Sequence, residues 1–294
     1  MRKQQLINLI LFTVILGLGL FIWLDPFSEP EIAPIHLTQV DPAKVNRITL
    51  SRGSKSEFIL EMLPSKVQSS WYLTLPLKLP ANPIKVDQLL ALLRTNSFRQ
   101  YRIKFDNLAK LGLHNPEWEI VFDSANASTT VQFGKTEPIG QKRYVLVNGT
   151  VHLINDRFSQ YNFGSPLMLA NLDILPVDKS VKELHLPGKV IKKVDGQWQS
   201  SPSGDTISQN AYKEFIDEWR YAQALRVALA DKTDLSSDAQ PVTVILEKAD
   251  QPIHFTIEAT EQDYVVTNKD WGVRYYLNSS VGEKLLQLES PSQE

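Results

Sequence analysis

The sequence of 294 residues contains no cysteine. This absence excludes disulfides, thiol nucleophiles, iron–sulfur clusters and zinc sites built on thiolates. A strong charge of one sign is also lacking, because the formal net charge is −2, so nucleic acid is not expected as a partner. Secreted eukaryotic proteins of this length more often carry disulfides, so the missing cysteines favour a bacterial cell envelope.

Sequence motifs of catalysis and metal binding are lacking as well. The five histidines show neither HxH nor HxxxH spacing, and there is no Walker A loop and no GxGxxG. No serine stands in a G-x-S-x-G motif. The 33 acidic residues do not single out a carboxylate pair for glycoside hydrolysis. We therefore expect no enzymatic activity, no metal site and no cofactor, and the alternative is a hydrolase acting on the cell envelope.

One long apolar run stands near the N-terminus. Residues 6–24 are uncharged and follow Arg2 and Lys3, and a helix of this length crosses a hydrocarbon layer of ~30 Å. Positive residues stay on the cytoplasmic side. The sequence therefore predicts a cytoplasmic tail over residues 1–5, a transmembrane anchor over residues 6–24, and a single-pass inner-membrane protein with its bulk in the periplasm. Bulky residues end the run, which favours a retained anchor over a cleaved signal peptide.

The remaining chain has a repeated pattern. Four prolines predict a tether over residues 25–43. Beyond the tether, alternating residues predict strands, and one segment of helical spacing occurs in each half. The order of patterns is the same in both halves, so we expect two related modules over residues 44–177 and 178–289, followed by a tail over residues 290–294. Strands interrupted by single helices predict an α+β fold of two mainly antiparallel sheet modules, each with a packed helix.

The two predicted helices lie within residues 82–103 and 207–228. Asn82 and Pro83 suit the N-cap and first helical positions of the first helix. The dipeptide Asn148-Gly149 stands between two β-rich runs and predicts a tight hairpin.

The stretch LAKLGLHNPEWEIVF, residues 108–122, combines residue types of a binding site with those of a turn. Gly112 suits the left-handed end of a helical turn, and Pro116 prevents the helix from resuming. A strand begins near Trp118 because apolar residues alternate from there. We interpret the stretch as structural, with His114 in a solvated loop.

Aromatic side chains supply the candidate binding residues. One group lies on a predicted strand of the first half and has a counterpart in the second half, and another lies near the last predicted hairpin. Such side chains line grooves for sugars or peptides. Packing between a sheet and a helix is their more common use, and both interpretations stay open. The candidates are Trp71, Tyr72, Trp198, Trp271, Tyr275 and Tyr276.

The first half also carries the motifs W-Y-L-T-L-P, K-V-D-Q-L-L-A-L-L, L-G-L-x-x-P-x-x-x-I-V-F, F-G and Y-V-L-V. Across roughly residues 45–154 the chain resembles the bacterial family called domain of unknown function 4340. The second half keeps Trp198 and the helix but lacks the Gly-Leu-x-x-Pro element. The matching residues are Trp71, Pro76, Val86, Leu89, Leu90, Leu93, Leu111, Gly112, Leu113, Pro116, Phe133, Gly134, Tyr144 and Val151.

The resemblance implies an envelope protein, often anchored in the inner membrane, and some relatives lie beside ABC-type transporter or gliding-motility components. It carries over no catalytic residue. We therefore predict a scaffold or accessory subunit of an inner-membrane complex such as a transporter. Its predicted partners are the membrane, through residues 6–24, and a membrane protein. The alternative is a periplasmic binding module for an envelope polymer or small solute, with a groove between the two modules.

Overall fold

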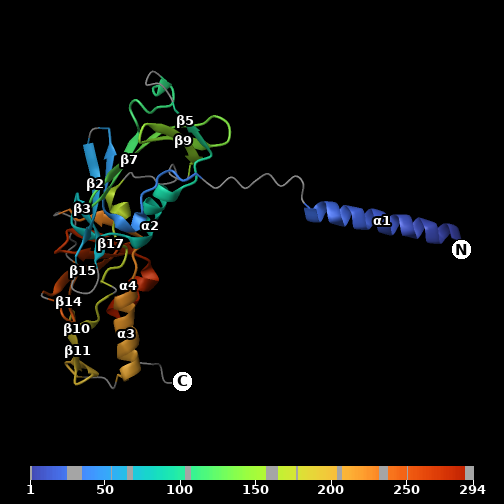
Figure 1. Cartoon of the computed structure of the whole chain (residues 1–294). Helices are drawn as coiled ribbons and strands as arrows, with labels where there is room; N and C mark the ends of the chain where they lie inside the picture. The colour runs from blue at the N-terminus through green and yellow to red at the C-terminus, as the bar shows by residue number, and fades with distance from the viewer. Residues whose placement is uncertain are drawn as a thin grey trace. The chain divides into compact units, whose positions relative to one another are not determined.

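The computed structural model describes residues 2–24, 35–53, 55–64, 69–102, 107–156, 165–176, 178–203, 207–231, 238–249 and 251–288. It divides into two compact units, Met1–Ile35 and His36–Glu294. The first unit contains helix α1, and the second contains two β-sheets with the other helices (Figure 1). Most of the predicted tether, residues 25–34, and the predicted tail, residues 290–294, lie outside the described residues.

Helix α1 (Arg2–Leu24) covers the segment predicted to be a transmembrane anchor, residues 6–24. No helix in the described part of the chain is both long and apolar enough to cross a bilayer. The predicted anchor is therefore wrong, and so is the predicted single-pass inner-membrane protein with a cytoplasmic tail and a periplasmic bulk.

The first sheet contains nine described strands, all paired antiparallel, in the order β4-β3-β2-β1-β6-β7-β8-β9-β5. Successive side chains of a strand point to opposite faces of a sheet. One set of buried apolar side chains of these strands lies on the face that packs against α2. The strands are β1 (Val45–Arg52), β2 (Lys55–Leu63), β3 (Ser70–Leu75), β4 (Leu79–Pro80), β5 (Arg99–Tyr101), β6 (Trp118–Ser124), β7 (Ser128–Thr136), β8 (Lys142–Val147) and β9 (Thr150–Asn155).

The second sheet has the order β12-β11-β10-β14-β15-β16-β17-β13, which is the order of the first sheet without a counterpart of β4. The register shifts at corresponding places, between Val45 and Arg47 in the first sheet and between Val181 and Glu183 in the second. The strands are β10 (Val181–Leu186), β11 (Lys189–Val194), β12 (Gln197–Ser201), β13 (Arg226–Leu229), β14 (Gln240–Leu246), β15 (Ile253–Ala259), β16 (Tyr264–Asn268) and β17 (Val273–Leu277).

Each sheet has one short helix inserted between its strands along the chain, α2 in the first sheet and α3 in the second. Figure 1 shows α3 lying beside β10 and β11, and its buried residues Phe215, Ile216 and Trp219 belong to the core of the second sheet. The helices and 3₁₀ turns described in the second unit are η1 (Pro42–Lys44), α2 (Pro83–Ala91), η2 (Leu92–Arg94), η4 (Pro166–Leu169), α3 (Gln209–Tyr221) and α4 (Ser279–Leu286).

The predicted fold class, α+β with an N-terminal transmembrane helix, is wrong. The described chain is mostly antiparallel sheet with few helices. The helical patterns over residues 82–103 and 207–228 are shorter as helices than predicted, because the end of each forms an edge strand. These edge strands are β5, which pairs with β9, and β13, which pairs with β17.

The segment linking the two sheets, residues 165–176, is bonded to both of them. Backbone hydrogen bonds attach it to the start of α2 on one side and to the end of α3 on the other. They join Asn82 N to Leu169 O, Asn171 N to Pro80 O, Ala224 N to Leu172 O and Ile174 N to Ala222 O. The segment therefore fixes the strand ends that surround the groove described below.

The stretch at residues 108–122 has the predicted structure. A helical turn ends at Gly112, whose φ of +73° is the left-handed conformation, and β6 begins at Trp118. Leu108 and Leu113 are buried against Val151 of β9. The stretch therefore covers the face of the first sheet opposite α2, and His114 is exposed.

Candidate functional site

A groove of about 620 Å³ lies between the two sheets of the second unit, within the size range of small-molecule sites. The first sheet contributes β3, β4 and the start of α2 to its lining. The second contributes the end of β14, the start of β15 and the turn between β16 and β17. The linking segment lines it as well. Residues far apart in the sequence thus meet in one concave surface.

Three aromatic residues line this groove: Trp71 and Tyr72 of β3, and Trp271. Each is half-buried. Trp71 packs in part on the core of the first sheet, and Trp271 packs in part on the core of the second. The backbone N–H of Trp271 donates to Asn268 Oδ1 at 2.9 Å, which fixes the turn that carries it. Trp71 and Trp271 are therefore each held by a core and remain partly exposed at the groove.

The linking segment supplies two polar residues of the groove, Asn171 and Asp173. Asn171 Nδ2 donates to Asp173 Oδ2 at 2.9 Å, and Gln223 Nε2 donates to Asp173 Oδ1 at 2.8 Å. Two amides thus orient the Asp173 carboxylate, whose oxygens have further lone pairs for a ligand donor. Asp178 and Lys179 also line the groove.

The other three predicted binding residues lie elsewhere. Trp198 lines a separate pocket beside α3. Tyr275 is buried in the core of the second sheet, where burial and then the charge of Asp173 raise the pKa of its hydroxyl. Tyr276 lies under the guanidinium of Arg226, whose Cζ is 3.3 Å from the ring centroid. The structure therefore brings together Trp71, Tyr72 and Trp271 only.

One serine–histidine pair resembles a catalytic arrangement but is enclosed. His152 Nδ1 lies 3.1 Å from Ser97 Oγ, and both residues are buried, at 5% and 8% exposure. The Ser97 hydroxyl donates to Arg99 O at 3.0 Å, so its proton is already bonded to the backbone. Burial also lowers the pKa of His152. This pair is a structural contact between β9 and the segment before β5.

Within the described residues, no group of three or more histidine and carboxylate side chains is placed to hold a metal ion. The expected lack of a catalytic activity stays a prediction. Sequence reasoning missed Asn171 and Asp173 as groove residues. They lie in irregular backbone between the two sheets, where the sequence has neither the helical nor the strand spacing of apolar residues that would single out a position.

The family described as Domain of unknown function (DUF4340) matches residues 71–248. The chain belongs to this family. The DUF4340 match begins on β3, at Trp71 of the groove, and ends just after β14, so it includes strands of both sheets and all of α3. It covers residues 71–154 of the resemblance recognised over residues 45–154 and extends beyond it on the C-terminal side only. No curated protein and no solved structure matches the chain.

Proposed function

We propose that this protein is a binding protein whose groove between the two sheets holds a sugar-like ligand, either a small solute or a segment of a polymer. The observation that carries the proposal is the meeting of Trp71, Tyr72 and Trp271 with the oriented carboxylate of Asp173 in one groove. Sugars present apolar C–H faces and hydroxyl groups together, and aromatic rings beside fixed amide and carboxylate oxygens match both.

The arrangement favours binding over a purely structural role for these aromatics. Rings that only fill a core are enclosed on both faces, whereas Trp71 and Trp271 are half-buried residues of the groove lining. Their backbones belong to strands and to a bonded turn, so little ordering is needed on binding. A site held in this way loses less conformational entropy when the ligand enters.

The test is calorimetric titration of the full chain with cellotriose and chitotriose as probes. We expect saturable binding by at least one probe, and we expect Trp71→Ala and Trp271→Ala to weaken it about tenfold or more, since each removes a stacking surface. Trp198→Ala is the matched control, because it removes a half-buried tryptophan outside the groove. Equal losses in all three variants, or no binding by either probe, would contradict the proposal.

The accessory-subunit role predicted from the sequence is the second proposal, and an edge strand supports it. The strand β13 pairs only with β17 among the described residues. Leu225, just before this strand, and Leu229, its last residue, are 65% and 55% exposed. A partner protein that adds a strand to this edge would cover both side chains. In-cell crosslinking followed by mass spectrometry tests this: Leu229→Asp should abolish recovery of a stoichiometric partner, whereas Trp271→Ala should not.

A further inference from the structure

A second pocket, of about 360 Å³, lies between α3 and the strands β11 and β12. None of its lining residues lines the groove described above. One wall of the pocket is a face of α3, and the other is formed by strands at one edge of the second sheet. The first sheet contributes no residue to it.

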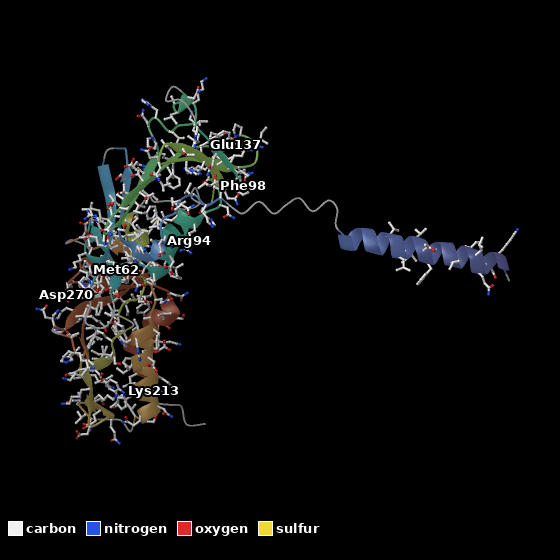
Figure 2. All side chains as sticks on the ribbon, viewed as in Figure 1. Met62, Arg94, Phe98, Glu137, Lys213 and Asp270 are labelled. Atoms are coloured by element: carbon white, nitrogen blue, oxygen red, sulfur yellow. The ribbon has the colours of Figure 1, made fainter. Side chains whose placement is uncertain are left out.

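The pocket is lined by three cationic side chains and one acidic one. Lys213 and Arg220 stand seven residues apart on α3, which places them two turns apart on one helix face. Lys193 faces them from β11, and Asp217 lies between them on the helix. Figure 2 labels Lys213 on α3. With these ionised groups the lining carries a formal charge of +2, so an anionic ligand is favoured.

The cations of the pocket lack anionic partners in the part of the chain that the structure describes. No ion pair there involves Lys193, Lys213 or Arg220. The Arg220 Nε is buried and has no hydrogen-bond acceptor among those residues. A buried donor without an acceptor costs free energy.

A flat apolar surface lies beside these charges. Trp198 is half-buried, and the ammonium of Lys193 lies 5.8 Å from its ring centroid. The Gln209 side chain clamps the Trp198 backbone, accepting from its N–H and donating to its carbonyl, each at 2.8 Å. The backbone that carries the indole is therefore fixed to the N-terminal end of α3, and Trp198 lines the pocket there.

We propose that this pocket binds a phosphate monoester, with the phosphoryl group on Arg220, Lys213 and Lys193 and the organic body on Trp198. A phosphate monoester carries a charge of about −1.5 to −2 near pH 7, which matches the formal charge of the lining. A guanidinium binds phosphoryl oxygens through directed N–H groups, and lysines add point charges. A carboxylate ligand would leave about one positive charge uncompensated.

The experiment is calorimetric titration of the full chain with glycerol 1-phosphate at fixed ionic strength. Glycerol and acetate are the probes that lack the phosphoryl group. We expect saturable binding of the phosphate ester alone, and we expect Arg220→Gln to weaken it about tenfold or more. Lys192→Gln is the matched control: it removes the same charge from the neighbouring residue of β11, which does not line the pocket. If Arg220→Gln does not fold, Lys213→Gln replaces it, since Lys213 is exposed.

Three outcomes would overturn the proposal. They are absence of saturable binding by the wild-type chain, equal affinity in the Arg220→Gln and Lys192→Gln variants, and acetate binding as tight as that of the phosphate ester. A pH series gives a further check. Because the second ionisation of a phosphate monoester lies near pH 6, binding should weaken several-fold between pH 7.5 and pH 5.

Discussion

At the scale of single residues, the two sheets place different polar groups at one corresponding buried position. His152 is opposite Val145 on the neighbouring strand, as Tyr275 is opposite Val266 in the second sheet. Burial disfavours the charged form of each side chain. It therefore lowers the pKa of His152, which is charged when protonated, and raises the pKa of Tyr275, which is charged when deprotonated. Tyrosine is neutral over the physiological range in either case, whereas histidine is not. The first sheet is therefore the one whose stability depends on pH through this position.

The sign of that dependence follows from proton binding. The ordinary pKa of histidine is 6.5, and that of His152 is lower in the folded protein. Below pH 6.5 the unfolded chain therefore binds a proton before the folded chain does, and the free energy of unfolding falls as pH drops toward the lowered pKa. Replacing His152 by Gln should flatten this part of the stability curve, measured by urea unfolding between pH 5 and pH 7.5. A variant curve as steep as that of the wild type would show that other groups dominate.

At the scale of elements, α2 and α3 begin with the same device. The Asn82 side chain accepts from Lys85 N at 3.2 Å, and the Ser208 side chain accepts from Ala211 N at 3.2 Å. Each cap satisfies one of the N–H groups that the first helical turn leaves without a partner. We expect Asn82→Ala and Ser208→Ala each to lower the free energy of unfolding by about 1 kcal/mol, measured by chemical denaturation.

Glycine at the same positions is the control. It lacks the accepting side chain but is tolerated at the cap, so Asn82→Gly and Ser208→Gly should cost only a few tenths of a kcal/mol. Equal losses for alanine and glycine would mean that the capping bonds contribute little and that a different contact of these side chains is responsible.

Elements with local signals could be predicted from the sequence. Asn82 with Pro83 marks the start of α2, Asn148 and Gly149 both adopt positive φ in the hairpin between β8 and β9, and Gly112 ends its helical turn as expected. Their conformations depend on neighbours in the chain. The edge strands β5 and β13 could not be predicted, because each is a strand only through pairing with a strand some fifty residues further along.

The groove was predictable only in part, for a related reason. Trp71 and Trp271 were recognisable as candidates by residue type, but 200 positions separate them in the sequence, and only the packing of the two sheets brings them together. Tyr275 and Tyr276 are neighbours of Trp271 in sequence, yet alternation along β17 sends one into the core and the other to the opposite face.

At the scale of the whole second unit, the two sheets share part of one core. Leu79 belongs to β4 of the first sheet and is 1% exposed, but it packs in the apolar cluster of the second sheet, with Trp219 and Phe255. Leu167 and Ile174 of the linking segment belong to the same cluster. The first sheet therefore supplies apolar surface that the second sheet needs in order to bury its own.

This sharing predicts an effect across the two sheets. Leu79→Ala should cost about 2–5 kcal/mol, because it leaves a cavity in a closed core, and the loss should extend to the second sheet. Hydrogen exchange of the full chain measures it as reduced protection of the amides in α3 and β10. Leu73→Ala is the matched control, since Leu73 is equally buried on the adjacent strand but packs only in the cluster of the first sheet.

The informative quantity is the ratio of protection lost in α3 to protection lost in β1. We expect this ratio to be larger for Leu79→Ala than for Leu73→Ala, because the cavity of the first variant lies in the apolar cluster to which α3 contributes. Equal ratios would show that the two sheets respond as one cooperative unit to any core change. A ratio smaller for Leu79→Ala would show that β4 stabilises its own sheet alone, and the groove would then be bounded by two independently stable walls.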